Sequence, residues 1–305
     1  MKKNLISILD LDLEEIEYLL SRAAALKKQL AQSLNYRPLQ GKILGMIFEK
    51  PSTRTRVSFQ VGMHQLGGEA IVLNWNELQL GRGETINDTA RVLSRYVNGM
   101  LLRTYSHQSI EEFARSSSVP VINGLSDFLH PCQILSDIFT IIEKIGDYRK
   151  IQVSYVGDGN NVANSWVNGA IKMGFNLVLS CPEGHEPHPL ILENAMKSAG
   201  SRIKIVRDPH LAVEKSDVIT TDVWTSMGQE SERKKRLSLF KDYQVNDQLM
   251  QSAKKDVLVM HCLPAHRGEE ITNSVLDGPN SIVIDQSENR LHMQKAILEK
   301  LLLAV

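Results

Sequence analysis

The chain has 305 residues, a length that exceeds one ordinary hydrophobic core and suits two domains of average size. Its 35 lysine and arginine residues balance 35 aspartate and glutamate residues, so the composition gives no general attraction to nucleic acid or acidic membranes. No apolar run is long enough for a signal peptide or a membrane span, and we expect a cytoplasmic protein that binds neither membrane nor nucleic acid. The three cysteines, Cys132, Cys181 and Cys262, show no C-x-x-C spacing, which argues against a disulfide framework or a zinc knuckle.

In the first half of the chain, short β-branched runs alternate with helical patterns. Asp12, followed three residues later by Glu15, predicts a capping box at the start of a first helix. The elements that follow are predicted as strand 42–48, helix 54–66, strand 70–73, helix 86–97, strand 100–103 and a long apolar helix 134–145. This alternation is typical of βαβ units and therefore of a parallel sheet.

A second alternating series begins after the polar residues 147–150. It predicts strands at 151–156, 177–179, 203–206, 218–221, 257–260 and 282–284, then a final helix at 287–302. We therefore predict an α/β protein of two lobes, each an open, mostly parallel sheet flanked by helices. Residues 1–150 are expected to form the first domain and 151–287 the second, with the helix at about 288–305 packing back onto the first. Open parallel sheets bind ligands at the carboxyl ends of their strands, so we expect the active site in the cleft between the lobes.

The segment 48–56 lies between a predicted strand and a predicted helix, and its residues are typical of an anion-binding site. The N–H groups at a helix start and the positive end of the helix dipole attract phosphate. Ser52 and Thr55 can donate hydroxyl hydrogen bonds, and Arg54 can engage two oxygens at once. The same residues are also compatible with an ordinary N-cap followed by solvated arginines. A P-loop is excluded, because its glycines and its Lys-Ser/Thr ending are missing.

A second cluster, His130-Pro131-Cys132-Gln133, opens the long apolar helix after the turn-rich residues 123–127. His130 and Gln133 are one turn apart and can together hold a carbonyl oxygen on which negative charge develops. Without such a site, His130 is interpreted as a capping or core histidine. Arg103 ends a predicted strand, where α/β proteins collect functional side chains; the alternative is a surface arginine.

The turn Gly157-Asp158-Gly159-Asn160-Asn161 follows the first strand of the second lobe, as a dinucleotide-binding turn does. Val162 stands where the third glycine of that motif is required. A nicotinamide-dependent oxidoreductase is therefore the alternative from a different functional class, and fluorescence titration with NADH tests it.

Together, these strings resemble the aspartate/ornithine carbamoyltransferase family across nearly the whole chain. The family's S-T-R-T motif for carbamoyl phosphate is present at 52–55, and its H-P-x-Q motif is present at 130–133. The resemblance implies catalytic roles for Arg103 and His130. It implies a carbamoyl phosphate site formed by Ser52, Thr53, Arg54, Thr55, Gln79, Arg103, His130, Gln133, Cys262, Leu263 and Arg290. It further implies a homotrimer, or a multiple of trimers, in which Gln79 of the 78–85 loop enters the site of a neighbouring subunit.

The second half resembles the ornithine-specific members of the family. Residues 222–228 match D-x-W-x-S-M-G, and 261–264 read H-C-L-P where the aspartate enzymes have H-P-L-P. The resemblance implies that ornithine is bound by Asn160, Asn161, Asp222, Ser226 and Met227. It makes Cys262 catalytic, either as a thiolate that takes a proton or as a group that orients the amine. A carboxylate at position 222 suits an ammonium group that an aspartate site would reject.

The implied reaction converts carbamoyl phosphate and L-ornithine into L-citrulline and phosphate, within arginine metabolism. The neutral side-chain amine attacks the carbamoyl carbon, and a tetrahedral intermediate expels phosphate. Because phosphate is already a good leaving group, no metal or organic cofactor is expected, and the protein's tasks are orientation and oxyanion stabilisation. Transfer to putrescine or an acylated ornithine is an alternative that the intact Ser226-Met227-Gly228 argues against. A catalytically silent regulatory relative is a third hypothesis, and a citrulline assay tests it.

Overall fold

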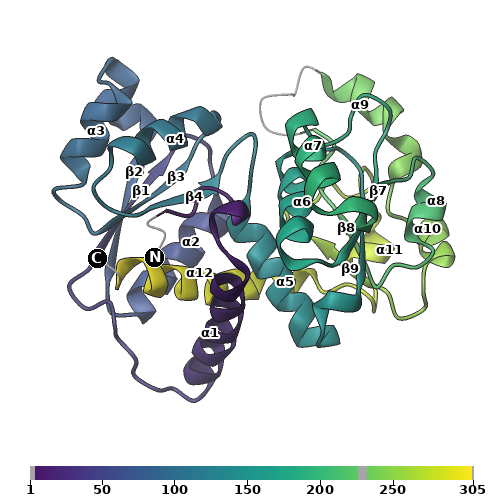
Figure 1. Ribbon diagram of the computed structural model, residues 1–305, viewed down its shortest axis with the longest axis horizontal. Helices are drawn as coiled ribbons and strands as arrows, with labels where there is room; N and C mark the ends of the chain where they lie inside the picture. Colours follow the sequence, from purple (N-terminus) through teal and green to yellow (C-terminus); the bar gives the residue numbers. More distant parts are fainter. Residues whose placement is uncertain (1–3, 226–231, 304–305) are drawn as a thin grey trace. The chain divides into compact units, whose positions relative to one another are not determined.

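The computed structural model describes residues 4–225 and 232–303, which fall into two compact units (Figure 1). The first unit comprises Met1–Phe139 and Glu288–Val305, and the second comprises Thr140–Ser287. The division falls inside helix α5 (Pro131–Ile145), earlier in the chain than the predicted position near residue 150. A continuous helix carries no compositional break, so the sequence does not mark this point. In the described ranges, none of the helices combines the length and apolar character that crossing a membrane requires.

The first unit is built on a four-stranded parallel sheet of order β2-β1-β3-β4. Its strands are β1 (Ile43–Phe48), β2 (Glu69–Asn74), β3 (Gly99–Arg103) and β4 (Val121–Leu125). Its helices are α1 (Leu13–Ala31), α2 (Thr53–Gln65), α3 (Ile86–Leu93), α4 (His107–Ser116), the first part of α5 and most of α12 (Val283–Leu302). Short 3-10 turns stand at η1 (Ile8–Asp10), η2 (Trp75–Glu77) and η3 (Gln79–Arg82).

Helices cover both faces of this sheet. Helices α3 and α4 lie on one side of the strands, and α1, α2 and α12 lie on the other (Figure 1). On the α3/α4 side, Ile47 and Met100 of the strands pack with Phe113 of α4 in one buried cluster. On the other side, Gly62 of α2 packs against Leu298 of α12, since a Cβ there would lie 3.6 Å from that side chain. Burial on both faces explains why β1 and β3 read as continuous apolar runs.

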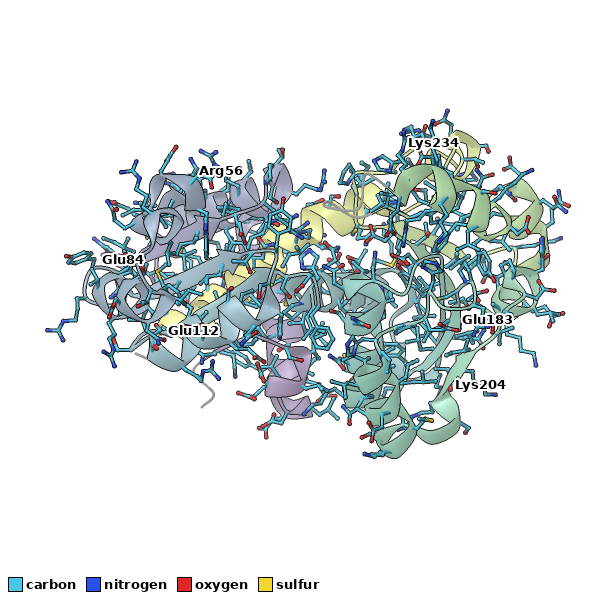
Figure 2. All side chains as sticks on the ribbon, turned by 90° about the horizontal axis from the view of Figure 1, so that it is seen from above. Arg56, Glu84, Glu112, Glu183, Lys204 and Lys234 are labelled. Atoms are coloured by element: carbon cyan, nitrogen blue, oxygen red, sulfur yellow. The ribbon has the colours of Figure 1, made fainter. Side chains whose placement is uncertain are left out.

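The second unit contains a five-stranded parallel sheet of order β7-β6-β5-β8-β9. Its strands are β5 (Gln152–Val156), β6 (Asn176–Ser180), β7 (Ile203–Ile205), β8 (Val218–Thr221) and β9 (Leu258–His261). Its helices are α6 (Asn161–Met173), α7 (Pro189–Ser198), α8 (Pro209–Val213), α9 (Arg233–Leu239), α10 (Asp247–Ser252) and α11 (Asn273–Leu276), with 3-10 turns at η4 (Tyr148–Lys150), η5 (Gly200–Arg202) and η7 (Lys241–Tyr243). Helices α6 and α7 lie on one side of the strands and α8, α10 and α11 on the other (Figure 1). The charged side chains of Glu84, Lys204 and Lys234 lie at the surfaces of their units (Figure 2).

Both sheets reverse their strand order next to their first strand. Strands β2 and β3 flank β1, and strands β6 and β8 flank β5. Loops that leave two neighbouring parallel strands in opposite directions open a crevice at the carboxyl ends, which is where such sheets bind ligands. In the first unit this crevice lies at 49–52 and Arg103, and in the second at 157–161 and Asp222.

Two local predictions were wrong. Residues 282–284 do not form a strand, because α12 begins at Val283 and only Ser281 makes an isolated bridge to β9. A three-residue apolar run fits a buried helix start equally well. Conversely, β4 occupies Val121–Leu125, although Asn123 and Gly124 are typical of turns. The structure accommodates them there because Asn123 Nδ2 donates to the Ile6 carbonyl and Gly124 lies close to Leu101.

Candidate functional site

The start of helix α2 follows directly on strand β1. Ser52 is its N-cap, with extended backbone, and its Oγ accepts a hydrogen bond of 3.3 Å from the Thr55 N–H. Thr53 is exposed and Arg54 is half-buried. Arg56 lies at the outer surface (Figure 2). A cavity of about 790 Å³ opens beside this helix start and is lined by Ser52, Thr53 and other residues. The capping and anion-binding interpretations of S-T-R-T are therefore compatible.

Two arginines converge on the first turn of α2. The Thr55 Oγ1 accepts a hydrogen bond of 3.2 Å from Arg103 Nη1 and one of 2.7 Å from Arg290 Nη2. Arg103 is the last residue of β3, and Arg290 comes from α12. Two guanidinium groups beside a helix N-terminus concentrate positive charge there, as binding of a phosphate ester or anhydride requires. The structure thus brings together three residues that the resemblance assigns to one carbamoyl phosphate site.

His130 is buried next to these charges. Its side chain is 3% exposed, and burial, followed by the positive charges of Arg290 and Arg103, lowers its pKa well below the ordinary value. The imidazole of His130 is therefore neutral at neutral pH. Gln133 Nε2 donates a bond of 2.7 Å to Asp137, which fixes the carboxamide, while its Oε1 has no hydrogen-bond partner among the described residues. A fixed acceptor next to a neutral imidazole suits an amide-like group that carries both an N–H and a carbonyl oxygen.

We expect His130 to make the protein sensitive to acid. The folded pKa lies below the ordinary value of 6.5, so the unfolded chain binds the proton first as the pH falls. The free energy of unfolding is therefore unaffected by this group above the pKa that His130 has in the unfolded chain. Below that pKa it declines, with a slope that approaches about 1.4 kcal/mol per pH unit. In denaturant unfolding at a series of pH values, His130→Gln should lose less free energy of unfolding on acidification than the wild type. The exposed His64, changed to Gln, serves as the control, and identical pH slopes for all three proteins would contradict the assignment.

Cys132 and Gln79, two residues of the predicted motifs, make none of the contacts with Thr55 described above. Cys132 of the H-P-x-Q motif is fully buried, its Sγ donates to the Asn123 carbonyl, and burial raises its pKa to about 12. This thiol is a packing residue.

Gln79 begins the η3 turn and is exposed, and no hydrogen bond in the described part of the chain joins it to Ser52–Thr55.

Asp222 organises the second unit's crevice. It follows β8 and is 7% exposed. Its Oδ2 accepts a bond of 2.8 Å from Asn160 Nδ2, and its Oδ1 accepts one of 3.1 Å from Cys262 Sγ. Asn160 also caps α6, because its Oδ1 accepts from the Val162 N–H. Asn160 is thus occupied in holding the carboxylate and the helix, whereas Asn161 is the first residue of α6, at the end where an anion is favoured.

His261, which precedes Cys262, forms a buried pair with Glu270 that was not predicted from the sequence. His261 Nδ1 accepts a bond of 2.9 Å from the Leu263 N–H, and His261 Nε2 lies 3.0 Å from Glu270 Oε1. These contacts place the imidazole proton on Nε2, so the ring is neutral. Leu263 adopts the left-handed conformation, with φ of 55°, and its bond to His261 supports that strained turn. Glu270 sits in a polar stretch, and no local signal indicates that it is buried.

A second buried pair joins Arg236 of α9 to Asp158, which follows β5. Arg236 Nη2 forms an ion pair of 2.6 Å with Asp158, and Arg236 Nε donates to the Trp224 carbonyl. Burial raises the pKa of Asp158 to about 6, although Arg236 acts in the opposite direction. The predicted ornithine residues Ser226 and Met227 lie outside the described residues. The sequence singled out Asp158 only as part of a glycine turn and did not indicate Arg236.

The glycine turn after β5 has a packing role. A Cβ at Gly159 would lie 2.1 Å from the backbone of Glu186. The glycine is therefore required by the close approach of residues 186–187, and no approach of a pyrophosphate is needed to explain it. This observation removes the main support for a dinucleotide site.

Comparisons with known proteins agree along the whole chain. Residues 3–143 match the model of the aspartate/ornithine carbamoyltransferase carbamoyl-P binding domain, and residues 149–301 match that of the Asp/Orn binding domain. The chain is 58% identical to the ornithine carbamoyltransferase of Syntrophus aciditrophicus, over 99% of this chain and 100% of the relative. It is 55% identical to that of Archaeoglobus fulgidus, over 98% and 97%. Among solved structures, that of the ornithine carbamoyltransferase from Pyrococcus furiosus is similar, with a TM-score of 0.96 and 50% identity over 99% of this chain and 98% of that one.

Proposed function

Because this chain belongs to the aspartate/ornithine carbamoyltransferase family, it is a carbamoyltransferase, and we propose that it carbamoylates the side-chain amine of L-ornithine to give L-citrulline and phosphate. The observation that carries the choice of acceptor is the carboxylate of Asp222, oriented by Asn160 and Cys262. An ammonium-bearing side chain is attracted to such a group, whereas the side chain of aspartate is repelled. The names of the compared relatives support the same choice.

Carbamoyl phosphate binds in the first unit. The N-terminus of α2, with Ser52, Thr53 and Arg54, takes the phosphate. Arg103 and Arg290, both bonded to Thr55, lie beside the carbamoyl oxygen, on which negative charge grows as the tetrahedral intermediate forms. Neutral His130 donates a further hydrogen bond, and Gln133 Oε1 accepts one from the carbamoyl N–H₂. The family resemblance assigns Leu263 and Cys262 to the same ligand.

Ornithine binds in the second unit. Asn161, at the positive end of α6, takes the α-carboxylate, with Ser226 and Met227 of the predicted set. Asp222 and Cys262 take the side-chain amine. Asn160 acts through Asp222, whose carboxylate it orients, and is a positioning residue.

Deprotonation of the nucleophile is the chemical difficulty. An amine with an ordinary pKa of about 10.4 is neutral in only about one molecule in 2500 at pH 7. Asp222 attracts the ammonium form and thereby also stabilises it, so the proton has to leave before attack. Cys262 Sγ already donates to Asp222, and this contact supports a role of the thiol in aligning the amine on the carboxylate.

The site extends over two subunits of a cyclic homotrimer in this proposal. Gln79 is exposed on the η3 turn and is assigned to the phosphate in a neighbouring subunit's site. The support is the resemblance of the 78–85 loop to the loop that family members share between subunits. A cytoplasmic location stays a prediction from the sequence.

Acceptor specificity is tested by one assay run in parallel. With carbamoyl phosphate present, we expect carbamoylation of ornithine, and little or none of putrescine, aspartate or N-acetylornithine, because only ornithine presents both a free α-amino acid group and a side-chain amine. Colorimetric detection of the ureido product measures all four. Preference for any of the other three acceptors would overturn the proposed substrate, and saturable NADH binding would revive the dinucleotide alternative.

A further inference from the structure

Three potential metal ligands follow the Cys262–Pro264 turn. His266, Glu269 and Glu270 each offer one ligand atom, and these atoms all lie within 4.8 Å of one another. The His266 Nδ1 lies 3.8 Å from Glu269 Oε2 and 4.0 Å from Glu270 Oε2. These separations are too long for hydrogen bonds, and they exceed by roughly half an ångström or slightly more the spacing of about 3.3 Å between ligands in a tetrahedral zinc site.

The buried carboxylates point to a missing partner. Glu270 is 0% exposed, and its Oε1 accepts bonds from His261 Nε2 and from the His266 N–H. Its Oε2 is buried and has no hydrogen-bond partner in the described part of the chain, and the same holds for Glu269 Oε2. Leaving a buried carboxylate oxygen unsatisfied costs several kcal/mol unless a cation or donor reaches it.

The charges of this group are also unbalanced. Arg233 forms an ion pair with Glu269 Oε1. The His261 ring that contacts Glu270 is neutral, because its Nδ1 accepts from the Leu263 N–H. Apart from His266 itself, the two carboxylates therefore face one arginine, and negative charge at this group attracts a cation. The His266 side chain is 43% exposed, so it can rotate to shorten its distances to the carboxylates.

We propose that His266, Glu269 and Glu270 bind a divalent transition-metal ion, with Zn²⁺ as the preferred ion. One imidazole and two carboxylates are a ligand set that zinc accepts, and they leave a fourth position for water. Its ligands differ from Asp222, His261 and Cys262, whose atoms form a second possible metal cluster in the ornithine region, although Glu270 contacts His261 of that cluster.

The test uses a tag-free chain stripped of metal, in which Cys262→Ser removes the thiol of that second cluster. Zn²⁺ is titrated into this protein in competition with a chromogenic chelator, and we expect one equivalent to bind. Adding His266→Ala to this background should weaken binding at least about 100-fold, because loss of even an outer-shell partner of a metal costs about 10- to 100-fold. Glu269→Gln should weaken it in the same direction.

The matched control is His64→Ala, which removes an exposed histidine of the first unit and should leave the affinity unchanged. Circular dichroism and thermal unfolding of the metal-free variants verify that each is folded. With Co²⁺, the Cys262→Ser protein should show an absorption spectrum of nitrogen and oxygen ligation that His266→Ala abolishes. If the Cys262→Ser protein binds no Zn²⁺, or if His266→Ala binds it as tightly as its parent, the site does not exist.

Discussion

Replacing Asp222 with asparagine should lower the rate of citrulline formation by on the order of 30- to 5000-fold, the equivalent of losing about 2–5 kcal/mol from a charge-assisted contact. The asparagine keeps the shape of the side chain and removes its charge. It also places an N–H₂ group where Asn160 Nδ2 and Cys262 Sγ now donate, so one of these two bonds is lost. The affinity for carbamoyl phosphate should stay nearly unchanged, because the residues proposed to hold the phosphate belong to the first unit.

Calorimetric titration with each substrate separates these two effects. Asp217→Asn is the matched control, since Asp217 precedes the same strand and its carboxylate accepts from the Gln152 N–H and pairs with Lys254. This variant should retain activity. Weakened binding of carbamoyl phosphate to a well-folded Asp222→Asn protein would contradict the division of substrates between the units.

Mixing two inactive variants should restore about a quarter of the wild-type activity if sites are shared between subunits. The variants are Arg54→Ala and Gln79→Ala, unfolded together and reassembled in equal amounts. In a three-fold ring, random mixing makes about three quarters of the rings mixed, and each mixed ring contains one junction where an intact Arg54 meets an intact Gln79 of the next chain. One site in three is therefore restored in these rings.

A second mixture provides the control. Arg54→Ala and Arg103→Ala affect two residues that the shared-site hypothesis assigns to the same chain, so their mixed rings should regain no activity. Subunit exchange is verified with chains of two different masses by native mass spectrometry. If exchange is complete and the Arg54/Gln79 mixture stays as inactive as its parents, the shared-site hypothesis is wrong and Gln79 does not act in a neighbouring chain's site.

Several features were determined by the sequence because they depend on local patterns. The alternation of apolar runs with helical stretches predicts parallel sheets, and the hydroxyl of Ser52 ahead of α2 predicts its N-cap. The strings at 52–55, 130–133, 222–228 and 261–264 indicate the family, which the comparisons confirm. These patterns can be recognised in the sequence because each involves residues only a few positions apart. Local ambiguity accounts for the errors at 282–284 and in β4, where an apolar triplet and an Asn-Gly pair fit more than one conformation.

Only the tertiary structure decided how distant residues act on one another. Arg290 meets Thr55 across 235 positions of sequence, and Glu270 becomes fully buried beside His261 although its neighbours are polar. The neutral state of His130 likewise follows from burial and from two arginines on other elements. Burial and electrostatic potential are sums over everything that packs around a group, so segments from β3, α5 and α12 had to be placed before the charge of one imidazole could be assigned.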